Sequence, residues 1–359
     1  HLHGFMWIKD IRAVGTNNAR IFVRRNLLAW IDEVNYSNEQ IWKEDVIAKR
    51  IFYLLTNLSF FLETADENFQ KIFSEHLNKQ SMILYKIIKK KEKINIFSLK
   101  SMILSTFCFD NLSSLYSFSI KLLLKTVKED ISDDGLHRLR SPSQHFFFLC
   151  SLLDIKNFLG NMNREIPEEI NQKIDQMLSA LKFFRIGNGQ LAIFNTYDTI
   201  NINQIDNLLK KVDHKYRLPK ITSCSDFYRA SKNKLTLIMD CGTPTKEKTH
   251  AGTLSFEFSH LSEKIVVNCG SPFVNNKNWH DAMRSTAAHS TLNINEINSS
   301  DIFFEKDTTT RIAKTHSSQF NDNDNICIDS YHTGYRSLFG LLHRRLIHID
   351  QKKLIVRGE

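Results

Sequence analysis

Apolar residues recur at intervals of three and four through the first half of the chain, which is the spacing of one buried helix face. Such runs cover Ile47 to Leu62, Phe69 to Leu77, Leu99 to Phe107 and Ile166 to Phe184, joined by short polar links. The last run ends just before Gly187. We therefore expect stacked helical hairpins in residues 1–187 and a domain boundary close to residue 187.

The second half changes to short apolar runs at near-regular spacing, a pattern typical of antiparallel strands. Residues 188–359 are therefore predicted to form an antiparallel β-sandwich, entered through a strand after Gly189 and a polar connector over residues 201–230. The expected strands are Leu235–Asp240, Thr253–Phe258, Lys264–Cys269, Thr291–Ile294, Thr310–Lys314, Ile326–Asp329, Leu346–Ile349 and Leu354–Val356. The fold class expected for the chain is thus α+β with two domains.

The charge balance favours an anionic partner, since the formal net charge is +9. A basic surface suits an acidic polysaccharide or a nucleic acid, although a general bias toward Lys, Asn and Ile explains the same excess. No apolar run approaches the ~18 residues of a membrane span. The six cysteines show no Cys-x-x-Cys spacing, which argues against a thiolate zinc site and against a disulfide framework. Because the chain starts without Met and stops in a strand-like run, we expect a fragment truncated at both ends.

Two polar clusters stand out from these patterns. The turn Ser132–His145 carries Asp-Gly and Ser-Pro turn signals together with two His and two Arg. The block His250–Leu292 places four polar residues at the ends of predicted strands, namely His250, Asn268, Arg284 and His289. The plain interpretation is a polar turn with a basic face, and histidines that serve only the fold. The alternative is a site on a sheet face.

Both clusters resemble the heparinase II/III family of polysaccharide lyases. In that family the sheet domain carries His-x-His-Ala-Asp-x-x-Ser-Phe-Glu, Val-Asp-Pro-Gly and Arg-Ser-Thr-x-x-His-Asn-Thr, and Lys248–Glu257, Val267–Gly270 and Arg284–Thr291 occupy those places here. The turn Ser132–His145 is similar to the family phrase Asp-Gly-Gly-His-Phe-Glu-x-Ser-Pro-x-Tyr-His. The resemblance covers most of the chain and implies an incomplete α/α toroid followed by the β-sandwich.

A lyase of this kind removes the C5 proton of a uronic acid and expels the 4-O substituent. The reaction needs a base, an acid and a group that neutralises the sugar carboxylate. The resemblance makes His137, His145 and Lys248 the catalytic candidates, the last acting as a base only if burial lowers its pKa. Substrate-binding candidates are Arg138, Arg140, Gln144 and Arg284, the arginines through bidentate contacts with a carboxylate. The residues His250, Asn268 and His289 fall where the family holds a metal, usually zinc.

Several positions depart from the family pattern. Gln144 stands where the family has its catalytic Tyr, and Lys248 stands where it has a His. Asn268, a neutral and weaker zinc ligand, replaces an Asp. The functional hypothesis is therefore a polysaccharide lyase that cleaves uronate-containing glycans by β-elimination, with a non-catalytic glycan-binding protein as the alternative. A nucleic-acid binder is a third hypothesis, for which the sequence offers no zinc finger, RNP motif or helix-turn-helix signature.

The expected partner is an acidic polysaccharide or oligosaccharide, and the expected cofactor is zinc in a weakened site. The family resemblance places the protein in the periplasm or cell envelope. A cytoplasmic location stays open, because we expect the natural N-terminus to lie outside this sequence.

Overall fold

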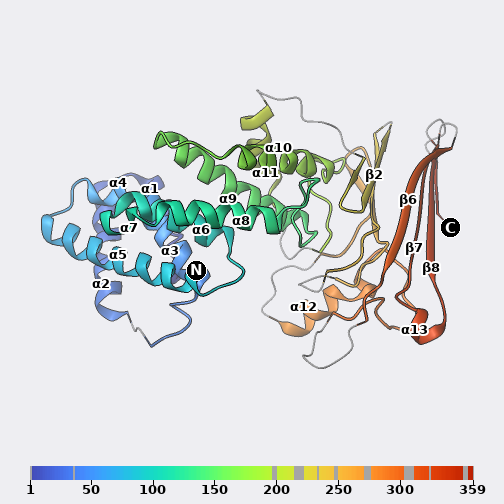
Figure 1. The fold of residues 1–359 in the computed structure, drawn as a ribbon, viewed down its shortest axis with the longest axis horizontal. Helices are drawn as coiled ribbons and strands as arrows, with labels where there is room; N and C mark the ends of the chain where they lie inside the picture. Colours follow the sequence, from blue (N-terminus) through green and yellow to red (C-terminus); the bar gives the residue numbers. More distant parts are fainter. Residues whose placement is uncertain are drawn as a thin grey trace. The chain divides into compact units, whose positions relative to one another are not determined.

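The computed structural model describes the chain except residues 1, 35–36, 196–199, 214–221, 233, 246–249, 271–275, 303–310, 323–324, 351–354 and 359. It forms two compact units, whose elements are labelled in Figure 1. Unit 1 comprises His1–Lys128 and Ser151–Pro167, and unit 2 comprises Glu129–Cys150 and Glu168–Glu359. Unit 2 therefore contains a turn from the helical half of the sequence as well as the sheets.

Unit 1 is built from helices packed through apolar faces. They are η1 (Leu2–Gly4), α1 (Ile8–Val14), α2 (Asn17–Glu33), α3 (Glu44–Thr56), α4 (Leu58–Leu62), α5 (Glu67–Lys89), α6 (Ile96–Cys108), α7 (Asp110–Ser113), most of α8 (Tyr116–Asp130) and the second half of α9 (Pro142–Asn161). Helix α5 shows why the sequence adopts this structure. The Asp66 side chain accepts a hydrogen bond from the Phe69 backbone at the helix start, and Phe69, Phe73 and Leu77 then recur on one buried face.

Unit 2 combines two antiparallel sheets with short helices. The first sheet has the order β1 (Ser223–Cys224), β2 (Phe227–Lys232), β3 (Leu235–Asp240), β4 (Phe256–His260) and β5 (Glu263–Val266). The second has the order β6 (Thr315–Asp322), β7 (Asn325–His332), β8 (His343–Asp350) and β9 (Ile355–Gly358). The helices are α10 (Glu168–Phe183), α11 (Ile202–Asp213), α12 (Lys277–Arg284), η2 (Thr286–Ala288) and α13 (Arg336–Phe339).

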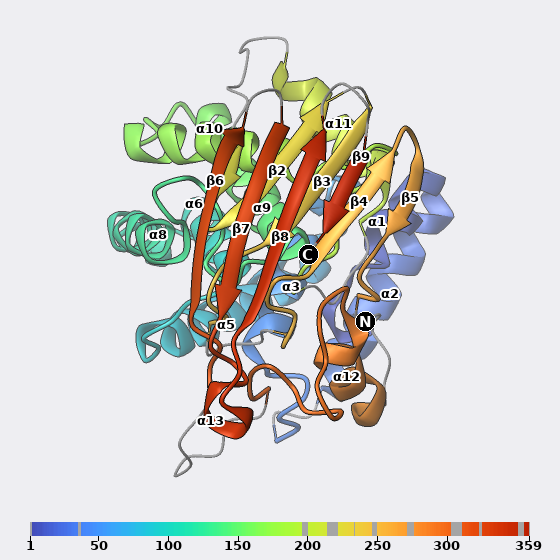
Figure 2. The same cartoon turned by 90° about the vertical axis from the view of Figure 1, so that its right-hand side faces the viewer.

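The two sheets share one hydrophobic core, and Figure 2 shows them lying one in front of the other. The core contains Leu237 and Met239 from β3, Ile328 from β7, and Ile347 and Ile349 from β8. Because side chains alternate along a strand, the other face of the first sheet is left for a different set of contacts. On that face lie polar residues of β3 and β4, which the candidate site uses.

The predicted change from helices to strands is present in the structure. The last helix of the helical half ends at Phe183, and the sheets that follow are antiparallel. Strands cover the predicted runs at 235–240, 326–329 and 346–349. The compact units divide the chain elsewhere than at residue 187, because residues 129–150 and α10 pack with the sheets.

Four local predictions were wrong. The expected polar connector 201–230 contains α11, whose Ile205 and Leu209 are buried on one face, and also β1 and β2. Leu191 forms only an isolated bridge with Arg185, so the strand expected after Gly189 is absent from the described residues. Residues 291–294 form no strand because their backbone bonds to side chains, as when Tyr335 Oη donates to the Leu292 carbonyl. Residues 311–314 likewise lie outside any strand.

Candidate functional site

The turn at residues 131–141 is held rigidly inside unit 2. Ser132 Oγ accepts a hydrogen bond from the Leu136 backbone at 2.9 Å, and the Asp134 carboxylate accepts one from the Ser225 hydroxyl at 2.7 Å. Gly135 has φ +90°, and a Cβ there would lie 2.5 Å from the carbonyl carbon of Gln176 in α10. Only glycine fits both this backbone conformation and this close approach.

Arg140 connects the turn to the first sheet. It is buried, and its guanidinium forms an ion pair with the equally buried Asp240 at the end of β3. The guanidinium carbon also lies 4.4 Å from the centre of the Phe227 ring. Burial raises the pKa of Asp240, and the Arg140 charge opposes that shift. This cation is fully engaged by the protein's own groups.

Asn195 joins the turn to the sheet motif. Its Nδ2 donates to the Arg140 carbonyl at 3.2 Å, and its Oδ1 accepts from the His250 backbone at 3.0 Å. The residue has φ +46°, a left-handed conformation that Asn tolerates better than most side chains. One buried amide thus places the turn next to the first motif histidine.

His250 and His289 form a buried imidazole pair. His250 Nδ1 and His289 Nε2 lie 3.0 Å apart, with the ring planes at 81°. His289 Nδ1 lies 2.7 Å from the Ser285 carbonyl, which can only accept, so the His289 proton is on Nδ1. His250 Nδ1 must then donate to His289 Nε2. Burial lowers the pKa of both residues, so the pair is neutral near pH 7.

The glycine at position 252 makes room for this pair. A Cβ at Gly252 would lie 2.6 Å from Cδ2 of His289. The family pattern has Asp at this position. The His289 ring therefore occupies space next to Gly252 that a larger side chain would need.

Asn268 and Glu257 extend the polar layer. Asn268 Nδ2 donates to the Ile193 carbonyl at 3.0 Å, and its Oδ1 accepts from the Ser290 backbone at 3.1 Å. The Asn268 backbone in turn donates to Glu257 Oε1 at 3.2 Å. Burial raises the pKa of Glu257 to about 7, and within the described part of the chain its Oε2 has no hydrogen-bond partner.

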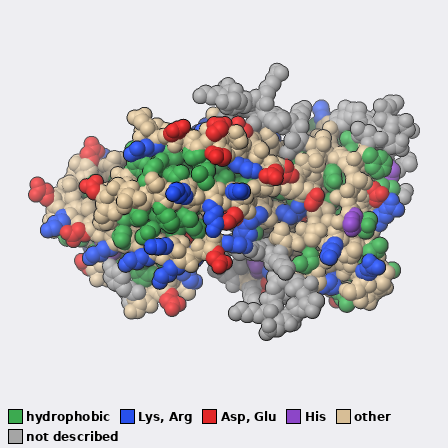
Figure 3. Space-filling model, in the orientation of Figure 1, with side chains coloured by type: hydrophobic (Ala, Val, Ile, Leu, Met, Phe, Trp, Pro, Cys, Tyr) green, Lys and Arg blue, Asp and Glu red, His purple; other side chains and the backbone are tan. Residues whose placement is uncertain are grey.

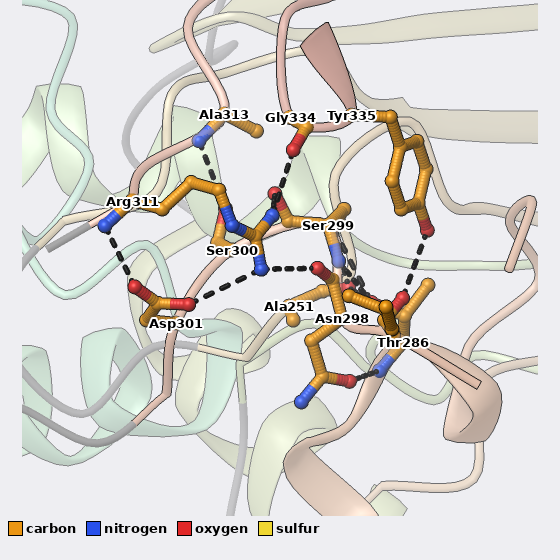
Figure 4. Close-up of polar contacts among 11 residues, drawn as sticks. Ala251, Thr286, Asn298, Ser299, Ser300, Asp301, Arg311, Ala313, Gly334 and Tyr335 are labelled. Atoms are coloured by element: carbon orange, nitrogen blue, oxygen red, sulfur yellow. Dashed lines mark hydrogen bonds and ion pairs between the residues drawn. The ribbon is translucent and has the colours of Figure 1, made fainter. Parts of the chain in front are cut away.

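A second network holds the loops that carry the histidines (Figure 4). The Arg311 guanidinium donates to the carbonyls of Asn298, Ser299 and Gly334 and pairs with Asp301. Thr286 Oγ1 then donates to the Ala251 carbonyl at 2.7 Å. Because Ala251 follows His250 and Thr286 precedes His289 by three residues, this network fixes the backbone on both sides of the imidazole pair.

The donor set does not complete a zinc site. Two nitrogens on one tetrahedral zinc lie about 3.3 Å apart, given ~2.0–2.1 Å bonds, so the imidazole pair has suitable spacing. The third expected ligand, Asn268, instead gives its oxygen to Ser290. Among the described residues, no group of three His, Cys, Asp or Glu side chains is arranged to hold a metal ion. The residues present therefore do not fit a closed zinc site, and zinc binding stays a prediction.

The histidines of the turn are buried. His145 is 0% exposed, and its Nε2 lies 2.9 Å from the Met177 carbonyl of α10. Burial lowers the pKa of His145 to about 4. His137 Nδ1 accepts from the Leu139 backbone, and burial, with smaller contributions from His145 and Arg138, lowers its pKa to about 3. His145 thus holds α9 against α10, whereas the slightly exposed His137 is the better placed of the two for chemistry.

The remaining predicted residues have varied environments. Arg138 forms an ion pair with Asp130, and Gln144 is half-buried in the first turn of α9. Arg284 is buried and donates to the Ile302 carbonyl at 2.9 Å. Lys248 lies outside the described residues. The structure thus brings Arg140, His250, Asn268 and His289 into one network, while the catalytic and substrate-binding roles stay predictions.

Sequence reasoning missed three members of this network: Asn195, Asp240 and Glu257. Asn195 follows the predicted hinge, and a polar residue directly after an apolar run was the available signal. Asp240 and Glu257 sit in strands, where a lone carboxylate among apolar residues signals a buried partner. The sequence could not identify the partners of these carboxylates, because Arg140 and Asp240 are 100 residues apart.

Residues 222–359 match the heparinase II/III-like C-terminal family. Residues 222–359 therefore carry the heparinase II/III-like C-terminal domain that the motifs predicted, and solved heparinase structures share the fold of the chain.

Relatives confirm the fold over nearly the whole chain. The crystal structure of heparinase III has a TM-score of 0.79 and 15% identity, covering 98% of this chain and 61% of that one. Heparan sulfate lyase HepC from Pedobacter heparinus has a TM-score of 0.70 and 16% identity, covering 98% and 60%. FtsZ-localized protein C of Caulobacter vibrioides is 25% identical over all of this chain. The chain spans 64% of the length of that curated relative.

Every helix in the described ranges is too short or too polar to span a bilayer.

Proposed function

We propose that this protein binds acidic, uronate-containing glycans on a lyase scaffold, with β-elimination slow or absent. The observation that carries the proposal is that residues expected to bind substrate or metal are already bonded to other groups of the protein. Arg140 is paired with Asp240, and His250 is bonded to His289. A sugar carboxylate would have to displace a buried ion pair to reach Arg140, which is costly.

Two features support a glycan as the ligand. The family and the solved structures that share the fold act on polysaccharides, and heparan sulfate lyase is named for an acidic one. The positive net charge of the chain matches such a polymer. An acidic polysaccharide therefore fits both the scaffold and the charge, whereas a neutral one fits only the scaffold.

The test is a screen of uronate-containing polysaccharides with the purified protein. Calorimetry measures binding, and ultraviolet absorbance of unsaturated uronate products measures elimination. We expect binding at low ionic strength without product formation. No binding to any acidic glycan in the panel would contradict the proposal.

A second candidate function is β-elimination with His137 as the base. The observation in its favour is that His137 is slightly exposed whereas His145 is fully buried, so His137 is the histidine of the turn that a ligand can approach. Product formation that disappears in His137→Gln, with glycan binding unchanged, would establish this function in place of the first.

A third proposal concerns location. The curated relative is named for its localisation to FtsZ and matches this chain along its full length. We propose that this chain shares that localisation. A fluorescent fusion imaged together with labelled FtsZ tests the proposal, and a uniform distribution of the fusion would contradict it.

A further inference from the structure

The positive charge of the chain is concentrated in one part of unit 1. Between residues 76 and 128 the sequence contains ten lysines and two acidic residues, Glu92 and Asp110. This stretch alone therefore carries a net +8, against +9 for the whole chain. A bias in amino-acid usage would spread lysine along the chain and would not remove acidic residues from one segment.

Most of these lysines lie at the surface of two helices that touch. In α5, Lys79 and Lys86 are seven residues apart, and Lys90, the C-cap residue of this helix, follows four residues later, which places all three on one exposed face. In α8, Lys121, Lys125 and Lys128 follow at intervals of four and three, again on one exposed face. Two other lysines of the segment have different roles, since Lys91 pairs with Glu44 and the buried Lys100 pairs with Asp154. These two therefore do not belong to the exposed rows.

Side-chain contacts fix the two helices side by side. The rings of Tyr85 in α5 and Phe118 in α8 are 5.9 Å apart and nearly perpendicular. Just before α8, Asn111 of α7 donates from Nδ2 to Asn78 Oδ1 of α5. Both contacts join residues thirty-three positions apart, so the segment 111–118, which leads into α8, runs in the same direction as residues 78–85 of α5. The two lysine rows therefore run along the same surface, with the aromatic pair between the helices.

Figure 3 shows this face of the molecule, where Lys and Arg side chains lie on both sides of an apolar area. Lys89 adds a further cation, since its Nζ lies 6.0 Å from the centre of the Tyr85 ring. Seven residues at a rise of 1.5 Å each separate two lysines of a row by about 10 Å along the helix. Cations in such a row can contact successive charges of an extended polyanion. Their compact charges need no fixed fork geometry, so they suit repeated carboxylates or sulfates.

We infer that the paired surfaces of α5 and α8 form a binding track for an extended acidic glycan, separate from the polar layer of unit 2. The same charge could attract a nucleic acid, so the choice of a glycan as the ligand rests on the proposed function. The glycan is favoured because the family and fold are those of polysaccharide-active proteins. The track gives the protein a means of holding a polymer independently of any chemistry at the histidines.

The test compares two triple variants that remove the same charge. Lys79→Gln/Lys86→Gln/Lys121→Gln removes part of the track, and Lys210→Gln/Lys211→Gln/Lys234→Gln removes three exposed lysines of unit 2. Heparin is the probe, and its affinity is measured by calorimetry at several salt concentrations. We expect the track variant to bind heparin at least about tenfold more weakly than the parent. The negative slope of log affinity against log salt should become shallower by about two to three, because three fewer lysines release counterions. The control should stay near the parent.

The outcomes separate this inference from the proposed function. If the parent binds heparin and both variants weaken equally, the track is not there, while glycan binding stands. If the parent binds neither heparin nor any other acidic glycan, both ideas fail. If the parent binds duplex DNA more tightly than heparin at the same salt, the track is assigned to the wrong polymer. Circular dichroism of each variant confirms that the helices are intact.

Discussion

At the scale of single residues, Asn268 decides whether the imidazole pair can hold a metal. An amide supplies no negative charge, and here its oxygen is already bonded to Ser290. We expect Asn268→Asp to raise zinc affinity by at least about tenfold, since a carboxylate is the better ligand. Zinc titration by calorimetry measures the change. Asn188→Asp, the same charge change in a loop outside the network, is the control, and equal affinities of the two variants would show that no latent zinc site exists.

The Arg140–Asp240 ion pair is the second residue-level feature with a measurable consequence. Arg140→Gln leaves the Asp240 carboxylate buried without its cation, and removing one partner of such a pair costs about 3–5 kcal/mol of unfolding free energy. Replacing both partners, as in Arg140→Met/Asp240→Leu, should recover most of that loss, because a buried pair is often no more stabilising than apolar packing. Urea unfolding of the three proteins measures this, and a double variant less stable than the single one would contradict the account.

At the scale of elements, the turn 131–141 depends on one glycine. Gly135→Ala places a methyl group 2.5 Å from the Gln176 backbone and also strains a left-handed conformation, so we expect a loss of roughly 2–4 kcal/mol. Gly15→Ala is the matched control, since Gly15 has φ +70° but no heavy atom within 4 Å of the added carbon. It should lose only the strain, about 1–2 kcal/mol. Equal losses in thermal or urea unfolding would mean that the contact with α10 is unimportant.

At the scale of the whole molecule, buried histidines make stability depend on pH. The pKa values of His137 and His332 are lowered to about 3, and those of His145 and His343 to about 4, in each case mainly by burial. Below about pH 6.5 the unfolded chain takes up protons that the folded chain does not, so unfolding becomes more favourable. Stability should be constant above pH 7 and fall steadily from pH 6.5 toward pH 4.

Urea midpoints at pH 7.5, 6 and 5 measure this dependence. The pair His332 and His343, joined by a 3.0 Å hydrogen bond across β7 and β8, offers a specific variant. His332→Asn/His343→Gln removes two of the titrating groups, so its midpoint should change less between pH 7.5 and pH 5 than that of the parent. A parent midpoint that does not change over this range would show that these imidazoles do not control acid stability.

The sequence alone determined the change from helices to antiparallel strands and pointed to the motif residues of the candidate site. Helical spacing ends at Phe184 and the last helix of that half ends at Phe183, because spacing along one segment reports which face of that segment is buried. The motifs also located His250, Asn268 and His289, whose surroundings are now one network. A polar helix such as α11 was missed, since only two buried residues, Ile205 and Leu209, carry its pattern.

Only the tertiary structure decided which polar groups are engaged and which are accessible. Arg140 and Asp240 carry no sign of each other in the sequence, and neither does Asn195, which bonds both the turn and His250. The burial of His145 depends on α10 packing over it. These contacts join residues tens of positions apart in the sequence. Long-range packing therefore decides whether a charged or imidazole group contacts a partner in the protein or is left for a ligand. Local residue patterns do not encode that packing.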